Sequence, residues 1–162
     1  MNGRAACLSL QRALALLLAL TPLLSVPSVA DDDLDQAFDR SFIVIETSRA
    51  ACYGFDVYLA LTPAQQRRGL MHVRSLPRFT GMLFVYHGDE LRSMWMKNTF
   101  IPLDILFIRS DGAVSSIEPM NEPLTLTSIA AVEPIRYVLE LNGGVAGELG
   151  IDTGSVVYFS GL

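Results

Sequence analysis

The chain has 162 residues and carries 17 acidic against 12 basic residues, a formal net charge of −5 at pH 7. The length suits one domain with one hydrophobic core. Because no basic stripe accompanies the acidic balance, nucleic acid and anionic membranes are not expected as partners.

Residues 1–30 have the three parts of a secretory signal peptide. Arg4 and Arg12 supply positive charge, residues 13–24 form the apolar core, and Ser28-Val29-Ala30 gives a cleavage site. The apolar run is shorter than the roughly 18 residues that a membrane span needs. We therefore expect cleavage after Ala30 and a periplasmic or secreted protein without a stable membrane span. Loss of both arginines would change the net charge from −5 to −7. Retention of the segment as an anchor is the alternative.

The mature chain is expected to begin with a flexible acidic leader, residues 31–40, followed by one β-rich domain, residues 41–162. Alternating and β-branched apolar runs, separated by turn residues, indicate about nine short strands. These runs cover residues 42–45, 54–61, 82–86, 91–96, 103–109, 113–117, 124–128, 135–141 and 155–160.

Turn and capping signals separate these strands. Thr62-Pro63-Ala64-Gln65 is a helix start, since it offers a hydroxyl cap and a proline at the first position. Gly69 should end that helix, and a second helical turn is expected at residues 145–149. Residues 87–90 and the Asp111-Gly112 pair each predict a hairpin. The pattern predicts a mainly β fold, a compact single-domain β-sandwich or distorted barrel with one or two short helices.

Residues 94–104 hold the only tryptophan, Trp95, and the only lysine, Lys97. Read as a strand, the segment places Trp95, Lys97 and Thr99 on one face. Asp104 lies in the apolar run that follows and, if buried, needs a partner such as Lys97. Two interpretations follow: a buried Lys97–Asp104 latch, or a pocket for a small polar ligand such as a sugar. The pocket would be formed by Trp95, Lys97, Asn98, Thr99 and Asp104.

Glu140 is a second acid within an apolar strand and is a further ligand-binding candidate. Together with Lys97 and Asp104 it would allow acid–base chemistry, as in a hydrolase or lyase that acts on an envelope polymer. No recognised catalytic or cofactor motif accompanies these residues, so we favour a binding module over an enzyme and expect no cofactor.

Methionine offers one more alternative. Met94 and Met96 would share a strand face, with His87 in a neighbouring turn, and thioethers can bind Cu(I) in exported proteins. The simpler interpretation is that the methionines fill gaps in a small β core.

Several motifs resemble a known family, domain of unknown function 192. The central block is Trp95-Met96-Lys97-Asn98-Thr99, and the resemblance extends from about Phe42 to the end of the chain. The matching motifs also include Gly69-Leu70-Met71, Gly81-Met82-Leu83-Phe84, Ile101-Pro102-Leu103-Asp104, Phe107, Asp111-Gly112, Leu139-Glu140-Leu141, Gly150-Ile151 and Gly154. The resemblance implies a compact β-rich domain, commonly exported in bacteria, without an established activity. Gln65 and Ser155 depart from the family pattern, which affects capping and surface detail rather than the fold.

Overall fold

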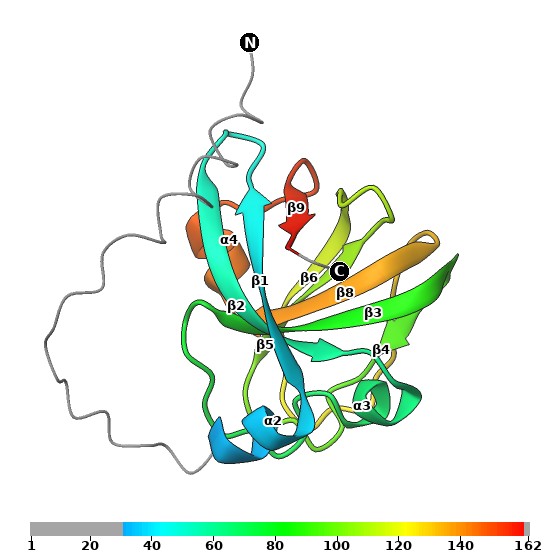
Figure 1. Cartoon of the computed structure of the whole chain (residues 1–162). Helices are drawn as coiled ribbons and strands as arrows, with labels where there is room; N and C mark the ends of the chain where they lie inside the picture. The colour runs from blue at the N-terminus through cyan, green and yellow to red at the C-terminus, as the bar shows by residue number, and fades with distance from the viewer. Residues whose placement is uncertain (1–30, 161–162) are drawn as a thin grey trace, which may run out of the picture.

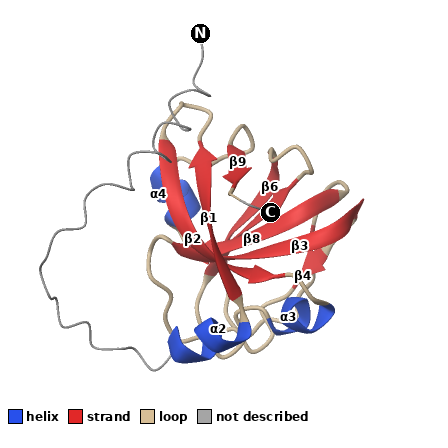
Figure 2. Cartoon of the chain, viewed as in Figure 1, coloured by secondary structure: helices blue, strands red, loops and turns tan. Residues whose placement is uncertain are grey.

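β-Strands are the main regular structure in the computed structural model, which describes residues 31–160 (Figures 1 and 2). Seven strands form one curved sheet in the spatial order β6-β5-β8-β3-β2-β1-β9. In chain order they are β1 (Asp39–Glu46), β2 (Cys52–Ala60), β3 (Thr80–Glu90), β5 (Leu103–Ile108), β6 (Val114–Asn121), β8 (Ile135–Asn142) and β9 (Val156–Phe159). A small second sheet pairs β4 (Ser93–Met94) with β7 (Ile129–Ala130). The predicted mainly β fold is confirmed.

Three short helices accompany the sheets: α2 (Asp31–Ala37), α3 (Pro63–Arg68) and α4 (Val145–Leu149). The helix start predicted from residues 62–65 is confirmed, because the Thr62 side chain and the Gln65 side chain cap each other's backbone N–H groups. The helical turn at 145–149 is also confirmed, and it ends at Gly150 with a left-handed φ of 67°. None of the helices in the described range is long and apolar enough to cross a membrane.

The sheet curls until its two outermost strands touch. All neighbouring strands in it are antiparallel except β2 and β3, whose parallel pairing requires the crossover that contains α3. At the seam, the N–H of Val114 donates to the carbonyl of Ser155 at 3.0 Å, and the N–H of Val157 donates to the carbonyl of Gly112 at 2.8 Å. The curved sheet is therefore close to a barrel at this end.

Both faces of the central strands are buried. One face carries the Leu139 cluster, which includes Phe55, Leu83 and Leu139 and is covered by α4. The other face carries the Phe84 cluster, whose buried members include Leu34, Tyr58, Leu70, Met82, Phe84, Met96 and Val138. Figure 1 shows α2 and α3 together at one end of the sheet, away from α4. Two separate sets of segments therefore cover the two faces.

Three predictions about local structure are wrong. The hairpin expected at residues 87–90 is absent, because β3 continues as one strand to Glu90 and pairs there with Ile135 of β8. Of the strand expected at 91–96, only residues 93–94 form a strand, β4. The strand expected at 124–128 is absent, and β7 forms instead at Ile129–Ala130.

The segment 31–40 is packed rather than a flexible leader. Residues 31–37 form α2, and Leu34 and Phe38 are almost completely buried in the Phe84 cluster. Arg68 pairs with Asp33 at 2.6 Å and lies over the Phe38 ring. Leu34 and Phe38 are four residues apart and joined by a backbone hydrogen bond of 3.0 Å, so both side chains point to the same side and this spacing explains the packing. The predicted signal peptide, residues 1–30, lies outside the described residues.

Asp104 is a buried structural latch, although its partners are not those predicted. Its carboxylate accepts hydrogen bonds from the backbone N–H groups of Met120 at 2.8 Å, Gly144 at 2.9 Å and Ala146 at 2.8 Å. These bonds connect the first turn of α4 and the end of β6 to the start of β5. No ion pair joins Asp104 to Lys97 within the described residues. The proposed Lys97–Asp104 pair is therefore wrong.

Asp104→Asn is expected to lower the free energy of unfolding by about 2–3 kcal/mol, because an amide can accept at only one of the two oxygen positions and leaves a buried N–H without a partner. Urea unfolding of the wild type and variant measures this. Asp39→Asn removes the same charge from an exposed site and should change stability by less than about 0.5 kcal/mol. Lys97→Met should cost less than about 1 kcal/mol. An effect of Lys97→Met as large as that of Asp104→Asn would contradict this account of Asp104.

Candidate functional site

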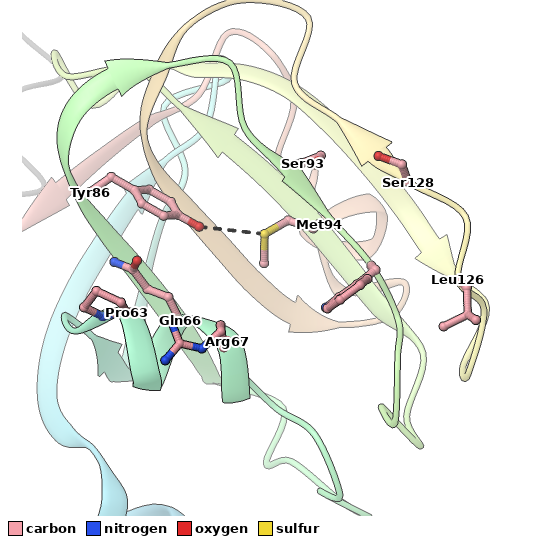
Figure 3. A pocket seen from close by; sticks show the side chains of 9 residues that line it. Pro63, Gln66, Arg67, Tyr86, Ser93, Met94, Leu126 and Ser128 are labelled. Carbon is pink, nitrogen blue, oxygen red and sulfur yellow. Dashed lines mark hydrogen bonds between the residues drawn. The ribbon is translucent and has the colours of Figure 1, made fainter.

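A surface pocket of about 410 Å³ lies between α3 and the small sheet. Figure 3 shows side chains of α3 on one side and those of Leu126 and Ser128 on the other, with Met94 between them. The pocket combines apolar, hydroxyl, amide and guanidinium groups. Its lining residues are Pro63, Gln66, Arg67, Tyr86, Ser93, Met94, Trp95, Leu126 and Ser128. Clefts that mix aromatic surface with a few polar groups are typical ligand sites.

The α3 wall of the pocket is fixed by Gln66. Its side-chain N–H₂ donates to the carbonyl of Val85 at 2.9 Å and to that of Ala60 at 3.4 Å. These bonds tie the helix to β2 and β3 and use both amide hydrogens, which leaves the amide oxygen as an acceptor. Arg67, on the next position of the helix, is exposed and makes no ion pair with any residue in the range 31–160.

Tyr86 and Met94 form the part of the pocket nearest the core. The Tyr86 hydroxyl donates to the Met94 sulfur at 3.9 Å, and the Arg92 guanidinium lies 4.2 Å from the centre of the Tyr86 ring (Figure 3 shows the first contact). Burial raises the pKa of Tyr86, while Arg92 lowers it and Glu140 raises it by smaller amounts. The phenol therefore remains protonated and serves as a hydrogen-bond donor. A thioether is a weak acceptor, so this donor is only weakly satisfied.

Trp95 is the predicted candidate that lines the pocket. It is 48% exposed, and the Lys97 ammonium lies 5.2 Å from the centre of its ring, within cation–π range. Lys97 itself is exposed and, among residues 31–160, forms no ion pair. Trp95 and Lys97 thus form an aromatic and cationic rim beside the pocket.

Asn98 and Thr99 shape the backbone instead of lining the pocket. Asn98 has a left-handed φ of 55°, its carbonyl accepts from the N–H of His72 at 2.8 Å, and its side chain contacts the Met71 sulfur at 3.8 Å. Thr99 is buried, and its carbonyl accepts from the N–H of Leu124 at 3.1 Å. The expected strand alternation ends at this turn, since a left-handed residue cannot continue a strand.

Glu140 and Asp104 lie on opposite faces of the sheet. In the β5–β8 register Asp104 faces Leu141, whereas Ile105 faces Glu140, and successive side chains of a strand point to opposite sides. Glu140 therefore belongs to the face of the Phe84 cluster and Asp104 to that of the Leu139 cluster. An acid–base site that combines Lys97, Asp104 and Glu140, as a hydrolase or lyase would require, is not formed.

Glu140 is a buried acid that forms no ion pair with any residue from 31 to 160. It is 4% exposed, and its Oε2 atom makes no hydrogen bond within this range. Burial raises its pKa from 4.5 to about 8, so the neutral carboxyl predominates at pH 7. Glu140 does not line the pocket, although it raises the pKa of Tyr86 by a smaller amount than burial does.

The methionine candidates lie in different environments from His87. Met96 is completely buried in the Phe84 cluster and Met94 packs against that cluster, whereas His87 is exposed on β3. No group of three or more His, Cys, Asp and Glu side chains within the described residues is arranged to hold a metal.

Among the nine lining residues, Trp95 is predicted from the sequence as a ligand-binding residue and Met94 as a Cu(I) ligand, whereas the other seven are not predicted. Arg67 lies within the predicted helix that ends at Gly69, and Tyr86 lies within the predicted strand 82–86, so neither carries a ligand-site signal in the sequence. One usable signal was Leu126, an apolar residue that is 70% exposed in a threonine- and serine-rich loop. The pocket joins segments about 20 to 30 residues apart, a proximity that depends on the crossover and the small sheet.

Stability is expected to decrease between about pH 5 and pH 8 because of Glu140. Its folded pKa of about 8 exceeds the unfolded value of 4.5, so its contribution is complete below the unfolded pKa and is lost as pH rises through the folded pKa. The slope approaches about 1.4 kcal/mol per pH unit. Urea unfolding measures the free energy of unfolding at about pH 5.5 and 8.5. Between these two values it should fall by on the order of 3 kcal/mol less in Glu140→Gln than in the wild type.

The matched control for this pH experiment is Glu122→Gln, which changes an exposed glutamate. It should keep the wild-type pH dependence, since an exposed carboxyl contributes little to the difference between folded and unfolded states. Identical pH dependence in the wild type and Glu140→Gln would contradict the burial of a protonated Glu140.

Two solved structures resemble the chain in sequence and fold. A Sinorhizobium meliloti protein called a "putative transcription regulator" is 37% identical, with a TM-score of 0.75, over 77% of this chain and 97% of that chain. A protein of unknown function from Novosphingobium aromaticivorans is 33% identical, with a TM-score of 0.73, over 86% of this chain and 94% of that chain. No curated protein matches the sequence.

The family model DUF192, described as "Uncharacterized ACR", matches residues 44–159. This range includes nearly all of the large sheet, both strands of the small sheet, and every residue that lines the pocket. The resemblance inferred from the Trp95 block is therefore confirmed over most of the chain, and the protein belongs to the DUF192 family.

Proposed function

We propose that the protein is an exported binding module that holds a small polar ligand, a sugar or a related envelope component, in the Trp95 pocket. The observation that carries this proposal is the half-exposed Trp95 at the edge of a 410 Å³ pocket. A large aromatic ring exposed beside a concave polar surface can stack on the apolar face of a sugar ring, while its neighbours bind the hydroxyl groups.

The polar groups around Trp95 support a ligand rich in hydroxyls. Ser93 and Ser128 can both donate and accept, the Gln66 amide oxygen can accept, and the Tyr86 hydroxyl can donate. Gln66 and Tyr86 are also held by contacts to the strands beneath them. A ligand would therefore meet a largely preformed set of partners, which reduces the entropy that binding costs.

A non-catalytic role fits the distribution of titratable groups. The nine lining residues include no acid and no histidine, and Arg67 is their one ionisable group besides Tyr86. General acid–base catalysis needs a group whose pKa lies near the working pH within reach of the substrate, and the acid of that kind, Glu140, is buried and does not line the pocket. Export rests on the signal-peptide pattern of residues 1–30.

Titration with monosaccharides and peptidoglycan fragments tests the proposal directly. Trp95 is the only tryptophan of the chain, so any change in tryptophan fluorescence reports on the pocket itself. At least one sugar should change the fluorescence with saturable binding, with an affinity on the order of millimolar for a monosaccharide. Isothermal titration calorimetry should then show about tenfold weaker binding for Trp95→Ala.

Phe79→Ala is the matched control, because Phe79 is an aromatic residue of similar exposure, 45%, outside the pocket. Its affinity for the same sugar should equal that of the wild type. Equal losses in both variants would assign the effect to general destabilisation. Absence of saturable binding by every sugar and fragment would contradict the proposed function.

A further inference from the structure

Two of the four cations that form no ion pair among residues 31–160 lie at the Trp95 pocket. The other six of the ten basic residues in this range pair with acids. Arg67, which lines the pocket, and Lys97, which lies over Trp95, do not. Arg68, the neighbour of Arg67 on α3, instead pairs with Asp33 at 2.6 Å and contacts Phe38. Arg68 therefore binds α2, whereas its neighbour Arg67 lines the pocket.

No negative charge opposes these cations at the pocket. The nine lining residues contain no Asp or Glu, although the chain has 17 acidic residues. Glu90 is neutralised by Arg92 at 3.0 Å, and that arginine also stacks on the pocket-lining Tyr86. The buried Glu140, which does not line the pocket, is held mainly in its neutral form. The pocket is therefore a local positive site on an acidic protein.

The hydrogen-bonding groups of the pocket also favour a ligand that accepts hydrogen bonds. Arg67 offers guanidinium N–H groups that have no partner in the described part of the chain, and the Tyr86 hydroxyl has only a thioether at 3.9 Å. Both are donors that a carboxylate oxygen would satisfy better than a neutral hydroxyl, since charge-assisted bonds are roughly twice as strong as neutral ones. The serine hydroxyls and the Gln66 oxygen suit the remaining hydroxyl groups of a sugar.

From these observations we infer that the pocket selects an acidic sugar, with Arg67 as the residue that binds its carboxylate. The inference rests on the proposed function and adds the charge of the ligand. The sugar ring lies against Trp95, the carboxylate lies toward α3, and Lys97 at the rim adds long-range attraction. Arg67 acts as a specificity residue: it distinguishes an acidic sugar from its neutral parent, whereas Trp95 binds both.

Glucuronate and glucose provide the test, because they differ only in the carboxylate at C6. Calorimetric titration of the full chain at low salt should give at least about tenfold tighter binding for glucuronate than for glucose. Arg67→Gln should reduce that ratio to near one, because it should weaken glucuronate binding much more than glucose binding. About 0.5 M salt should lower the ratio in the wild type, because exposed charges are screened.

Arg68→Gln removes the same charge one residue along the helix, outside the pocket, and should keep the wild-type ratio. Equal binding of glucose and glucuronate by the wild type would overturn the acidic-sugar inference and leave the proposed function standing. A parallel loss of both ligands in Arg67→Gln would also overturn it. N-acetylalanine, a carboxylate without a sugar ring, should bind more weakly than glucuronate, and equal binding would remove the sugar from the inference. Failure of both sugars to bind would instead count against the proposed function.

Discussion

Burial of both faces of the central strands is the constraint on which the rest of the structure depends. All six residues of β5 are buried, and its neighbour β8 contributes to both apolar clusters. A sheet of this kind needs covering segments on each side. On the face of the Leu139 cluster the cover includes α4, whereas α2, residues of the segment 70–76 and the small sheet contribute to the other side. The Trp95 pocket lies where two covering pieces, α3 and the small sheet, meet.

The two buried acids in adjacent strands show two ways to place a carboxyl inside such a sheet. Asp104 accepts three backbone N–H groups, so its charge is compensated and it fixes α4 and the end of β6. Glu140 is opposite Ile105 and Met82 and has no comparable donors, and burial raises its pKa to about 8. Asp104 is a structural group, whereas Glu140 is a buried acid that is mainly neutral at pH 7. Because Asp104 and Glu140 lie on opposite faces of the sheet, they do not form the joint acid–base site that the sequence suggested.

Much of the fold could be predicted from local patterns, and the candidate site could be predicted only in part. Helix α3 followed from Thr62 and Gln65, and the β5–β6 hairpin followed from Asp111-Gly112, because these signals act over a few residues. The partners of Asp104 are backbone N–H groups, which nearly every residue carries, so the sequence does not reveal them. The sequence-based prediction of Lys97 as a charged partner is wrong for this reason. The predicted end of β3 is also wrong, because Glu90 pairs with Ile135 of β8, a strand that lies far along the chain. Trp95 is conspicuous in the sequence because it is the only tryptophan, whereas Arg67 lines the same pocket only because of the crossover between β2 and β3.

Mapping the binding site by NMR tests the central claim most directly, namely that the pocket between α3 and the small sheet is where a ligand binds. A ¹H–¹⁵N titration of the isotopically labelled protein with glucuronate follows every backbone amide and the single indole N–H of Trp95. The account predicts saturable shifts of the Trp95 indole and of amides in α3, in β4 and near Ser128, with the Asp104-bound amides of Gly144 and Ala146 unchanged. Shifts centred on α4 or on the far edge of the sheet, with the Trp95 indole unmoved, would contradict it.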